Sequence, residues 1–236
     1  MSSEQDYEWK GRTGPFTLRL TPRVFQPSPT SRVLADAIEV RPGETVIDVG
    51  CGSGVLSFVA ARLDAGMVYG TDISDEAVRV ASENAQRLHL ADRTEFRAGS
   101  LLAPLDGVVA DVVIGDVSGI PDEVAAVAGW FPDGHAGGPT GAEIPLAMLE
   151  EVGDHLKPGG RMYLPTGTIQ DERTILAKAR RIFGTLEEVA EREFPLPALV
   201  ARSKAVARLM AQGVVNLRRR GSRLLWRLAI WRCERS

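Results

Sequence analysis

Short apolar runs alternate along this chain with stretches of helical periodicity, an order typical of an α/β sheet. Residues 110–115 form a nearly continuous Val and Ile run, as expected of a buried parallel strand. Other apolar runs predict strands at residues 45–49, 67–71, 94–97, 161–164, 186–194 and 224–232. Apolar residues at helical spacing predict helices at residues 32–40, 54–64, 75–90, 142–156, 171–183 and 198–211.

Capping and turn-forming residues mark several ends of these elements. Ser31 and Ser74 stand where the N-caps of two helices are expected. Pro42-Gly43 ends the first helix, and the sequence K-P-G-G at residues 157–160 ends the helix that begins at Ala142. The pattern therefore places a strand after each of these two helix ends.

The most informative stretch lies at residues 46–54, where an apolar strand runs into glycines at alternate positions and then into an apolar helix. A glycine turn at a helix start lets backbone N–H groups approach a ligand closely, because no Cβ atom stands in the way. Asp72 follows at the carboxyl end of the next predicted strand. A carboxylate at this place can accept hydrogen bonds from two ribose hydroxyls, so the spacing predicts a nucleoside ligand.

The turn itself reads D-x-G-x-G-x-G from Asp48 to Gly54, and not the G-x-G-x-x-G of dinucleotide-binding folds. It resembles the first motif of class I S-adenosylmethionine-dependent methyltransferases. That resemblance implies a Rossmann-like α/β fold with helices on both faces of a seven-stranded, mostly parallel sheet whose last strand is antiparallel. S-adenosylmethionine is the cofactor that it implies, with S-adenosylhomocysteine as the product of methyl transfer.

The resemblance also implies a set of cofactor contacts. The turn around Asp48, with Cys51 contributing its backbone, would hold the methionine part, and Asp72 would hold the ribose. Ile73 would lie against the adenine, and Ser100-Leu101 stands where these enzymes usually have an acid. In full, the candidate cofactor residues are Phe25, Thr30, Asp48, Gly50, Cys51, Gly52, Gly54, Asp72, Ile73, Ser100, Leu101 and Asp116.

Within this class, residues 22–195 look most like the glutamine methyltransferases that modify release factors. The matching stretches are residues 21–31, the D-I-S-x-x-A-V sequence at 72–78, and Asn84-Ala85. Those enzymes end the fourth strand of the sheet in Asn-Pro-Pro-Tyr, which grips a planar amide, whereas this chain has D-V-S-G at residues 116–119. The difference removes the amide-binding geometry, so a glutamine substrate is not carried over.

Asp116 is the first candidate for catalysis, since a carboxylate there could orient or deprotonate an amine or hydroxyl; a structural role in capping the following turn is the alternative. His135 and Tyr163 are the other two catalytic candidates, and Asp133 and Glu143 are further possible bases. We expect residues 1–30 to close over the cofactor and residues 31–236 to form one catalytic domain. The long segments 116–141 and 197–222 are the expected substrate walls.

Composition agrees with an enzyme of one domain. The chain has 236 residues and 44% apolar content, and its two cysteines provide neither a disulfide framework nor a metal-ligand set, so we expect no metal. No apolar run is long enough for a membrane helix, and the polar N-terminus lacks a signal region, so we expect a cytoplasmic protein. Nothing in the sequence indicates the oligomeric state.

Charge is unevenly distributed in this chain of net charge −3. Residues 201–236 contain ten Arg or Lys and a single acid, Glu234. A solvated rim on a strand hairpin explains this pattern, and a binding surface for an acidic partner is the alternative.

Three functions follow from these observations. The first is methyl transfer to a small molecule, such as an amino acid or a natural-product intermediate, which the lost amide motif favours. The second is methyl transfer to a protein or an RNA, which the arginines at the C-terminus favour. The third is attack on the aminocarboxypropyl arm of the same cofactor, by another molecule or by its own amine, with methylthioadenosine as product.

Overall fold

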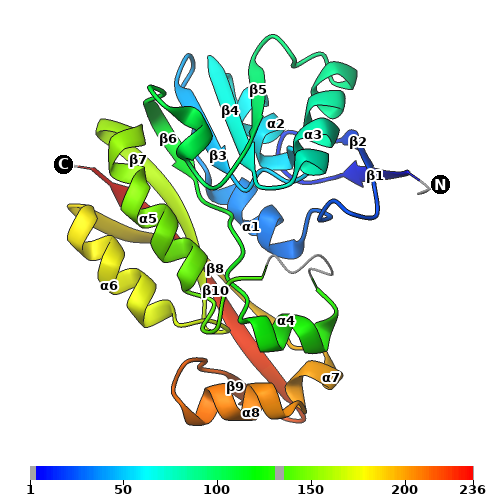
Figure 1. The fold of residues 1–236 in the computed structure, drawn as a ribbon, viewed down its shortest axis with the longest axis vertical. Helices are drawn as coiled ribbons and strands as arrows, with labels where there is room; N and C mark the ends of the chain where they lie inside the picture. Colours follow the sequence, from blue (N-terminus) through cyan, green and yellow to red (C-terminus); the bar gives the residue numbers. More distant parts are fainter. Residues whose placement is uncertain (1–3, 131–135, 236) are drawn as a thin grey trace.

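The computed structural model describes residues 4–130 and 136–235. Its centre is an eight-stranded sheet in the order β5-β4-β3-β6-β7-β10-β8, with β9 paired to β10 (Figure 1). The strands of this sheet are β3 (Thr45–Val49), β4 (Met67–Asp72), β5 (Thr94–Ala98), β6 (Ala110–Ile114), β7 (Leu156–Gly167), β8 (Thr185–Pro195), β9 (Arg218–Arg220) and β10 (Arg223–Glu234).

Strand directions confirm the predicted fold class. Strands β3 to β7 pair in parallel, and β10 lies antiparallel to both of its long neighbours, β7 and β8. Within this sheet, the strand that the sequence did not predict is β9, a short strand that pairs with the first residues of β10. The order β5-β4-β3 followed by β6 places a topological switch at β3, where ligands bind in open α/β sheets.

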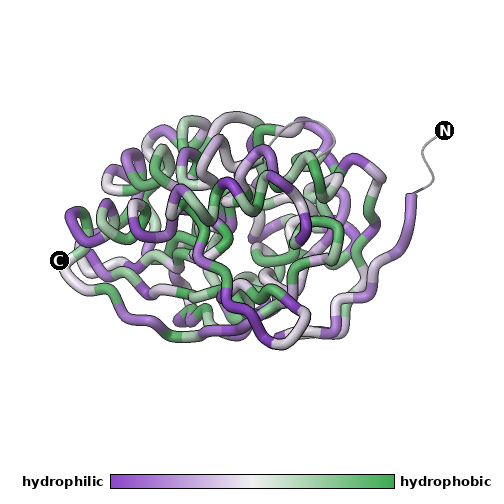
Figure 2. The backbone as a smooth tube through the Cα atoms, turned by 90° about the horizontal axis from the view of Figure 1, so that it is seen from below, coloured by the Kyte–Doolittle hydropathy of each residue, from purple (hydrophilic) through white to green (hydrophobic). Residues whose placement is uncertain are grey.

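Helices cover both faces of the sheet. They are α1 (Pro29–Ala37), α2 (Val55–Arg62), α3 (Asp75–Arg87), α4 (Asp122–Ala128), α5 (Glu143–His155), α6 (Glu172–Ile182), α7 (Ala198–Ala201) and α8 (Lys204–Ala211), with a 3-10 turn at Ala103–Leu105. Val46 packs in the core cluster of α1 and α2, whereas its neighbour Ile47 packs in the cluster of α5 and α6. Colours alternate along the chain in Figure 2 because each element has one buried side.

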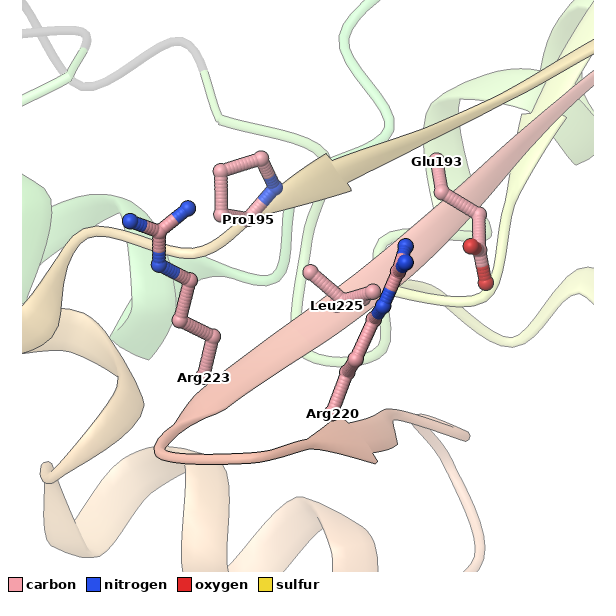
Figure 3. Close-up of a pocket in the computed structure, with 5 residues that line it drawn as sticks. All are labelled: Glu193, Pro195, Arg220, Arg223 and Leu225. Atoms are coloured by element: carbon pink, nitrogen blue, oxygen red, sulfur yellow. The ribbon is translucent and has the colours of Figure 1, made fainter.

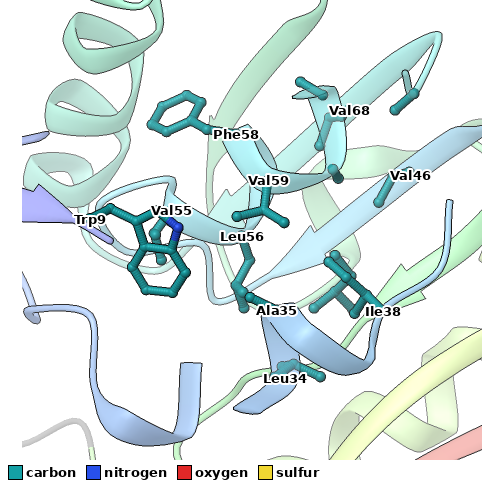
Figure 4. Close-up of a cluster of buried hydrophobic side chains, with 14 of the residues drawn as sticks. Trp9, Leu34, Ala35, Ile38, Val46, Val55, Leu56, Phe58, Val59 and Val68 are labelled. Atoms are coloured by element: carbon teal, nitrogen blue, oxygen red, sulfur yellow. The ribbon is translucent and has the colours of Figure 1, made fainter. Parts of the chain in front are cut away.

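An unpredicted hairpin, β1 (Gln5–Trp9) with β2 (Phe16–Leu20), begins the described chain. Trp9 is fully buried in the same core cluster as Val55 and Leu56 of α2, as Figure 4 shows. The Asn84 side chain also fastens the hairpin to α3: it accepts a hydrogen bond from Arg19 N at 2.8 Å and donates one to Arg19 O at 3.1 Å. Residues 5–20 are therefore part of the core.

The two predicted substrate walls pack against each other beyond one end of the sheet (Figure 1). Segment 116–141 contains the unpredicted helix α4, and segment 197–222 contains α7, α8 and β9. Val124 of α4 shares an apolar cluster with Val206 and Leu209 of α8, and Arg208 forms an ion pair with Glu123. We call this cluster, with α4, α7 and α8 around it, the helical lobe.

Some predicted boundaries were wrong for identifiable reasons. Helix α1 begins at Pro29 with Ser28 as its N-cap, because Pro is well accommodated in the first turn and Ser28 accepts hydrogen bonds from the N–H groups of Thr30 and Ser31. Residues 157–160 belong to strand β7, since Gly159 N and Gly160 O bond to the backbone of Arg235. The predicted helix at 198–211 is divided at Ser203, which caps α8.

None of the described helices has the length and apolar content needed to cross a membrane.

Trp9→Ala tests whether the N-terminal hairpin is part of the core. Truncating a fully buried indole should lower the free energy of unfolding by about 3–5 kcal/mol. Urea denaturation measures this loss, with Leu199→Ala as the control because the Leu199 side chain is 71% exposed. Equal stability of the two variants would contradict this place for the hairpin.

Candidate functional site

Three neighbouring strands end at one edge of the sheet and bring their following residues together. The pairing of Val49 with Thr71 and of Asp48 with Ile114 places the ends of β3, β4 and β6 side by side. The glycine turn follows β3, and Gly50 N and Cys51 N both donate to Thr71 O at 2.8 Å. The turn is thus fastened to the adjacent strand.

Each glycine of the turn has a positive φ: 76° at Gly50, 51° at Gly52 and 84° at Gly54. A Cβ atom at Gly54 would lie 2.7 Å from the Phe58 ring, so glycine lets helix α2 pack closely. At Gly52 the nearest atom to such a Cβ would be Phe25 O, at 4.0 Å. Space for a ligand therefore lies above Gly52, with the backbone of the N-terminal segment on its far side.

The carboxylate of Asp72 holds this geometry in place. Its Oδ2 accepts a hydrogen bond from Gly52 N, and its Oδ1 accepts one from Ser74 N, each at 2.9 Å. Gly99 N donates to the Asp72 carbonyl at 2.9 Å, which brings the end of β5 to the same place. Ser100 is exposed there and Leu101 is half-buried.

Two large apolar side chains stand exposed at this edge. Ile73 is 58% exposed and follows Asp72, and Phe25 is 54% exposed and belongs to the segment that passes Gly52. Exposed apolar groups beside a carboxylate and a glycine turn suit a ligand with one flat apolar part and one polar part. Thr30, in the first turn of α1, is half-buried nearby in the sequence.

Asp48 is fully buried beneath the turn. Its Oδ2 accepts a hydrogen bond from Ser57 Oγ at 2.6 Å, and its Oδ1 has no partner within the described chain. The pKa of Asp48 is raised to about 7, mainly by burial and also by the charges of Asp116 and Asp72, while the Ser57 hydrogen bond opposes the rise. The thiol of Cys51 is also buried, which raises its pKa and leaves it unreactive.

Asp116 follows β6 and faces helix α1. Its Oδ2 accepts a hydrogen bond from Ser31 Oγ at 3.2 Å. Burial raises the pKa of Asp116 to about 6, although the Ser31 hydroxyl opposes this shift. A Cβ atom at Gly50 would lie 3.2 Å from the Asp116 carbonyl oxygen, so this acid adjoins the glycine turn. Together with Asp48 and Asp72, it makes the site strongly acidic and complementary to a cation.

Of the remaining catalytic candidates, the two that the structure describes have structural roles. Tyr163 is fully buried, and its hydroxyl accepts a hydrogen bond from Glu39 N at 3.0 Å, beyond the last turn of α1. Glu143 caps the start of helix α5 by accepting hydrogen bonds from Thr140 N and Ala142 N. Asp133 and His135 lie outside the described residues.

Sequence reasoning missed three polar groups at this edge. Ser31 was predicted as an N-cap, but its hydroxyl bonds Asp116; Ser57 bonds Asp48; and Ser118 Oγ is buried without a partner in the described chain. A signal existed for Ser57, because it is the one polar residue in the apolar stretch 55–61. No pattern in the sequence marks the other two.

The sequence is similar to those of known proteins. Residues 29–131 match the family model described as Ribosomal protein L11 methyltransferase (PrmA). The release factor glutamine methyltransferase of Moorella thermoacetica is 35% identical over 166 residues, which cover 65% of this chain and 58% of that protein. The ribosomal protein L11 methyltransferase of Pelotomaculum thermopropionicum is 36% identical over 166 residues, 70% of this chain and 46% of that protein.

In sequence and in fold, the chain resembles the class I S-adenosylmethionine-dependent methyltransferases.

Solved structures of this class have the same fold. The match to the 16S rRNA N2 G1207 methyltransferase of T. thermophilus, in complex with AdoMet and guanosine, covers 100% of this chain and 52% of that chain, with a TM-score of 0.66 and 14% identity. The match to the ribosomal protein L11 methylase of Lactobacillus delbrueckii subsp. bulgaricus covers 90% of this chain and 82% of that chain, with a TM-score of 0.56 and 21% identity. The chain spans 58% and 46% of the two curated relatives described above, about half of their lengths.

Asp72→Ala tests whether S-adenosylmethionine binds at this edge of the sheet. Removing the carboxylate releases Gly52 N and takes away the acceptor at the end of β4, so we expect S-adenosylmethionine to bind at least tenfold more weakly, about 1.4 kcal/mol. Titration calorimetry measures the dissociation constant. Asp75→Ala removes an exposed acid three residues away and should leave it unchanged; equal affinities of the two variants would contradict the assignment.

Asp48→Asn tests the buried acid through stability. Because the native pKa of about 7 lies above the value of about 3.9 for an unfolded chain, the native state binds the proton more tightly, and stability falls as pH rises between these values. The variant lacks this loss, so relative to the unsubstituted protein it should be more stable at pH 8 than at pH 5. Urea denaturation at both pH values measures the difference; an unchanged difference would show that Asp48 titrates normally.

Proposed function

We propose that this chain transfers the methyl group of S-adenosylmethionine to an amine nitrogen of a protein. The observation that carries the proposal is the position of Asp116, a half-buried carboxylate that adjoins the glycine turn and has a pKa of about 6. At neutral pH it is mostly ionised, and it therefore attracts a protonated amine to the place where the cofactor is expected.

The residues of the glycine turn suit the cofactor. Gly52 leaves space for the ligand, Asp72 is placed to accept hydrogen bonds from ribose hydroxyls, and the exposed Ile73 offers an apolar surface to a base. The buried Asp48 beneath the turn adds negative charge that complements a cationic cofactor. When bound, the cofactor supplies an activated methyl group, so that the protein acts mainly by positioning the acceptor.

Asp116 has two tasks in this proposal. Its carboxylate first orients the acceptor, since Ser31 holds one oxygen by a hydrogen bond from helix α1. It then accepts the proton that an ammonium group must lose before its nitrogen has a lone pair for attack. Ser118 Oγ, buried in the same loop and without a partner in the described chain, provides the second polar contact for the acceptor in this proposal.

A protein acceptor is better supported than the small molecule first expected from the sequence. Both curated relatives reported above are named for protein substrates. The helical lobe also exposes apolar side chains suited to a protein partner: Leu199 of α7 is 71% exposed and Met210 of α8 is 38% exposed. A small acceptor does not require such a surface.

Methyl-labelled cofactor tests the proposal. The enzyme is incubated with tritium-labelled S-adenosylmethionine and with the protein, RNA and small-molecule fractions of a bacterial lysate. We expect label in material that protease digests and nuclease does not, and amino-acid analysis should find an N-methylated residue. Label confined to RNA or to the small-molecule filtrate would contradict a protein acceptor.

Asp116→Asn in the same assay tests the proton acceptor. Losing a general base should lower kcat about a hundredfold or more and remove the rise of kcat/KM near pH 6, while cofactor affinity changes less than about threefold. Asp122→Asn, the same substitution at an acid that bonds Gly138 N, is the matched control and should retain activity. Full activity of Asp116→Asn would remove Asp116 from the mechanism.

A further inference from the structure

The hairpin of β9 and β10 concentrates arginines at one end of the sheet. Since β10 runs antiparallel to β7 and pairs Leu228 with Gly167, the last residue of β7, its earlier residues extend past the carboxyl end of β7. That end belongs to the edge that carries the glycine turn and Asp116. The hairpin therefore projects from the same edge of the sheet as the candidate active site.

Only some of these arginines are neutralised. Arg218 forms an ion pair with Glu193, Arg227 with Glu188 and Glu191, and Arg232 with Glu187, all of these acids on strand β8. These ion pairs with the acids of β8 neutralise much of the positive charge near the C-terminus and form a solvated rim. They do not neutralise the arginines at the tip of the hairpin.

Three arginines at the tip, Arg219, Arg220 and Arg223, form no ion pair with any described residue and are exposed. The register places Arg220 directly opposite Arg223. Like charges at opposed positions of an antiparallel pair repel each other and weaken the strand pairing. An anion bound between Arg220 and Arg223 would reduce this repulsion, so the pair is complementary to an anionic ligand.

The surface around these arginines is hollowed. Arg220 and Arg223 flank one hollow, with Pro195 and Leu225 between them, as Figure 3 shows. Arg218, Arg219 and Arg227 line a second hollow, beside Thr168 and Asn216. The two hollows share Glu193 and Leu225, so a chain-like ligand can contact arginines in both.

We propose that this arginine tip binds the phosphate backbone of a single-stranded nucleic acid. Guanidinium groups match phosphates by paired hydrogen bonds, and protein surfaces for nucleic acids are more polar and more positive than those for proteins. An acidic protein is less suited, because none of the exposed large apolar side chains of the described chain lies on β8, β9 or β10 to anchor it. Three guanidiniums on one tip match the few successive phosphates of a single strand.

This proposal is independent of the acceptor identity proposed above. A nucleic acid held at the tip lies at the same sheet edge as Asp116, which would bring a nucleic-acid-bound protein to the active site. The surface can bind without methyl transfer, so binding and activity are measured separately. Failure of one leaves the other in place.

The test measures binding of fluorescent 12-residue oligouridine RNA and oligothymidine DNA by anisotropy at several salt concentrations. The triple variant Arg219→Gln, Arg220→Gln, Arg223→Gln should bind both at least tenfold more weakly at about 50 mM salt. Its salt dependence should fall by a slope of about 2, since each lost phosphate contact on a single strand contributes about 0.7. The three arginines form no ion pair within the described chain and the substitution removes their mutual repulsion, so the variant should melt at the same temperature or higher and keep its affinity for S-adenosylmethionine.

Two controls keep the result specific. Arg180→Gln with Arg181→Gln removes neighbouring exposed arginines that form no described ion pair on α6, and should leave oligonucleotide binding unchanged. Lysine at the three tip positions keeps the charge and should retain binding within about threefold. Equal loss in the α6 variant, or unchanged binding in the triple variant, would overturn the proposal, as would arginine-dependent binding of polyglutamate without binding of either oligonucleotide.

Discussion

The two hydrogen bonds accepted by the Asp72 carboxylate hold the site together. One comes from Gly52 in the turn after β3 and the other from Ser74 at the start of α3, so a single side chain fixes the ends of two adjacent units. Glycines at three alternate positions adopt the positive φ angles that the turn requires. Hydrogen bonds from the turn to the Thr71 carbonyl and to the Asp72 carboxylate then hold it in place. The space above Gly52 depends on this arrangement.

The negative charges of Asp116 and Asp72 disfavour ionisation of Asp48, and a bound cation would offset this effect. Burial is the main cause that raises the pKa of Asp48 to about 7 and that of Asp116 to about 6, and the charges of Asp116 and Asp72 add to the rise at Asp48. Such an arrangement costs stability in the empty protein but complements a positively charged cofactor and a protonated acceptor.

Much of the fold could be predicted because it depends on local patterns. Apolar runs identified the strands β3 to β8 and β10, and glycine spacing with Asp72 predicts the edge of the sheet where the cofactor binds. The β1–β2 hairpin was missed because Trp9 becomes apolar core only through contacts with helices far along the chain. Helix α4 was missed because it gains its buried face from α8, some 80 residues later in the sequence.

Site residues that depend on distant partners were the least predictable. Tyr163 has the chemistry of a catalytic group, but its strand turns it into the core. Likewise, the arginines near the C-terminus look alike in sequence, and only the acids of β8 separate the paired ones from the three at the tip. Local sequence therefore predicts a place for the cofactor but none for the acceptor.

The central claim, that the acidic edge directs attack at the cofactor's methyl group, is tested most directly by the nucleoside product. The enzyme is incubated with S-adenosylmethionine and its protein acceptor, and the product is identified by mass spectrometry. The account predicts S-adenosylhomocysteine in an amount equal to the methyl groups transferred. Methylthioadenosine as the product would mean attack on the aminocarboxypropyl arm and would contradict the account.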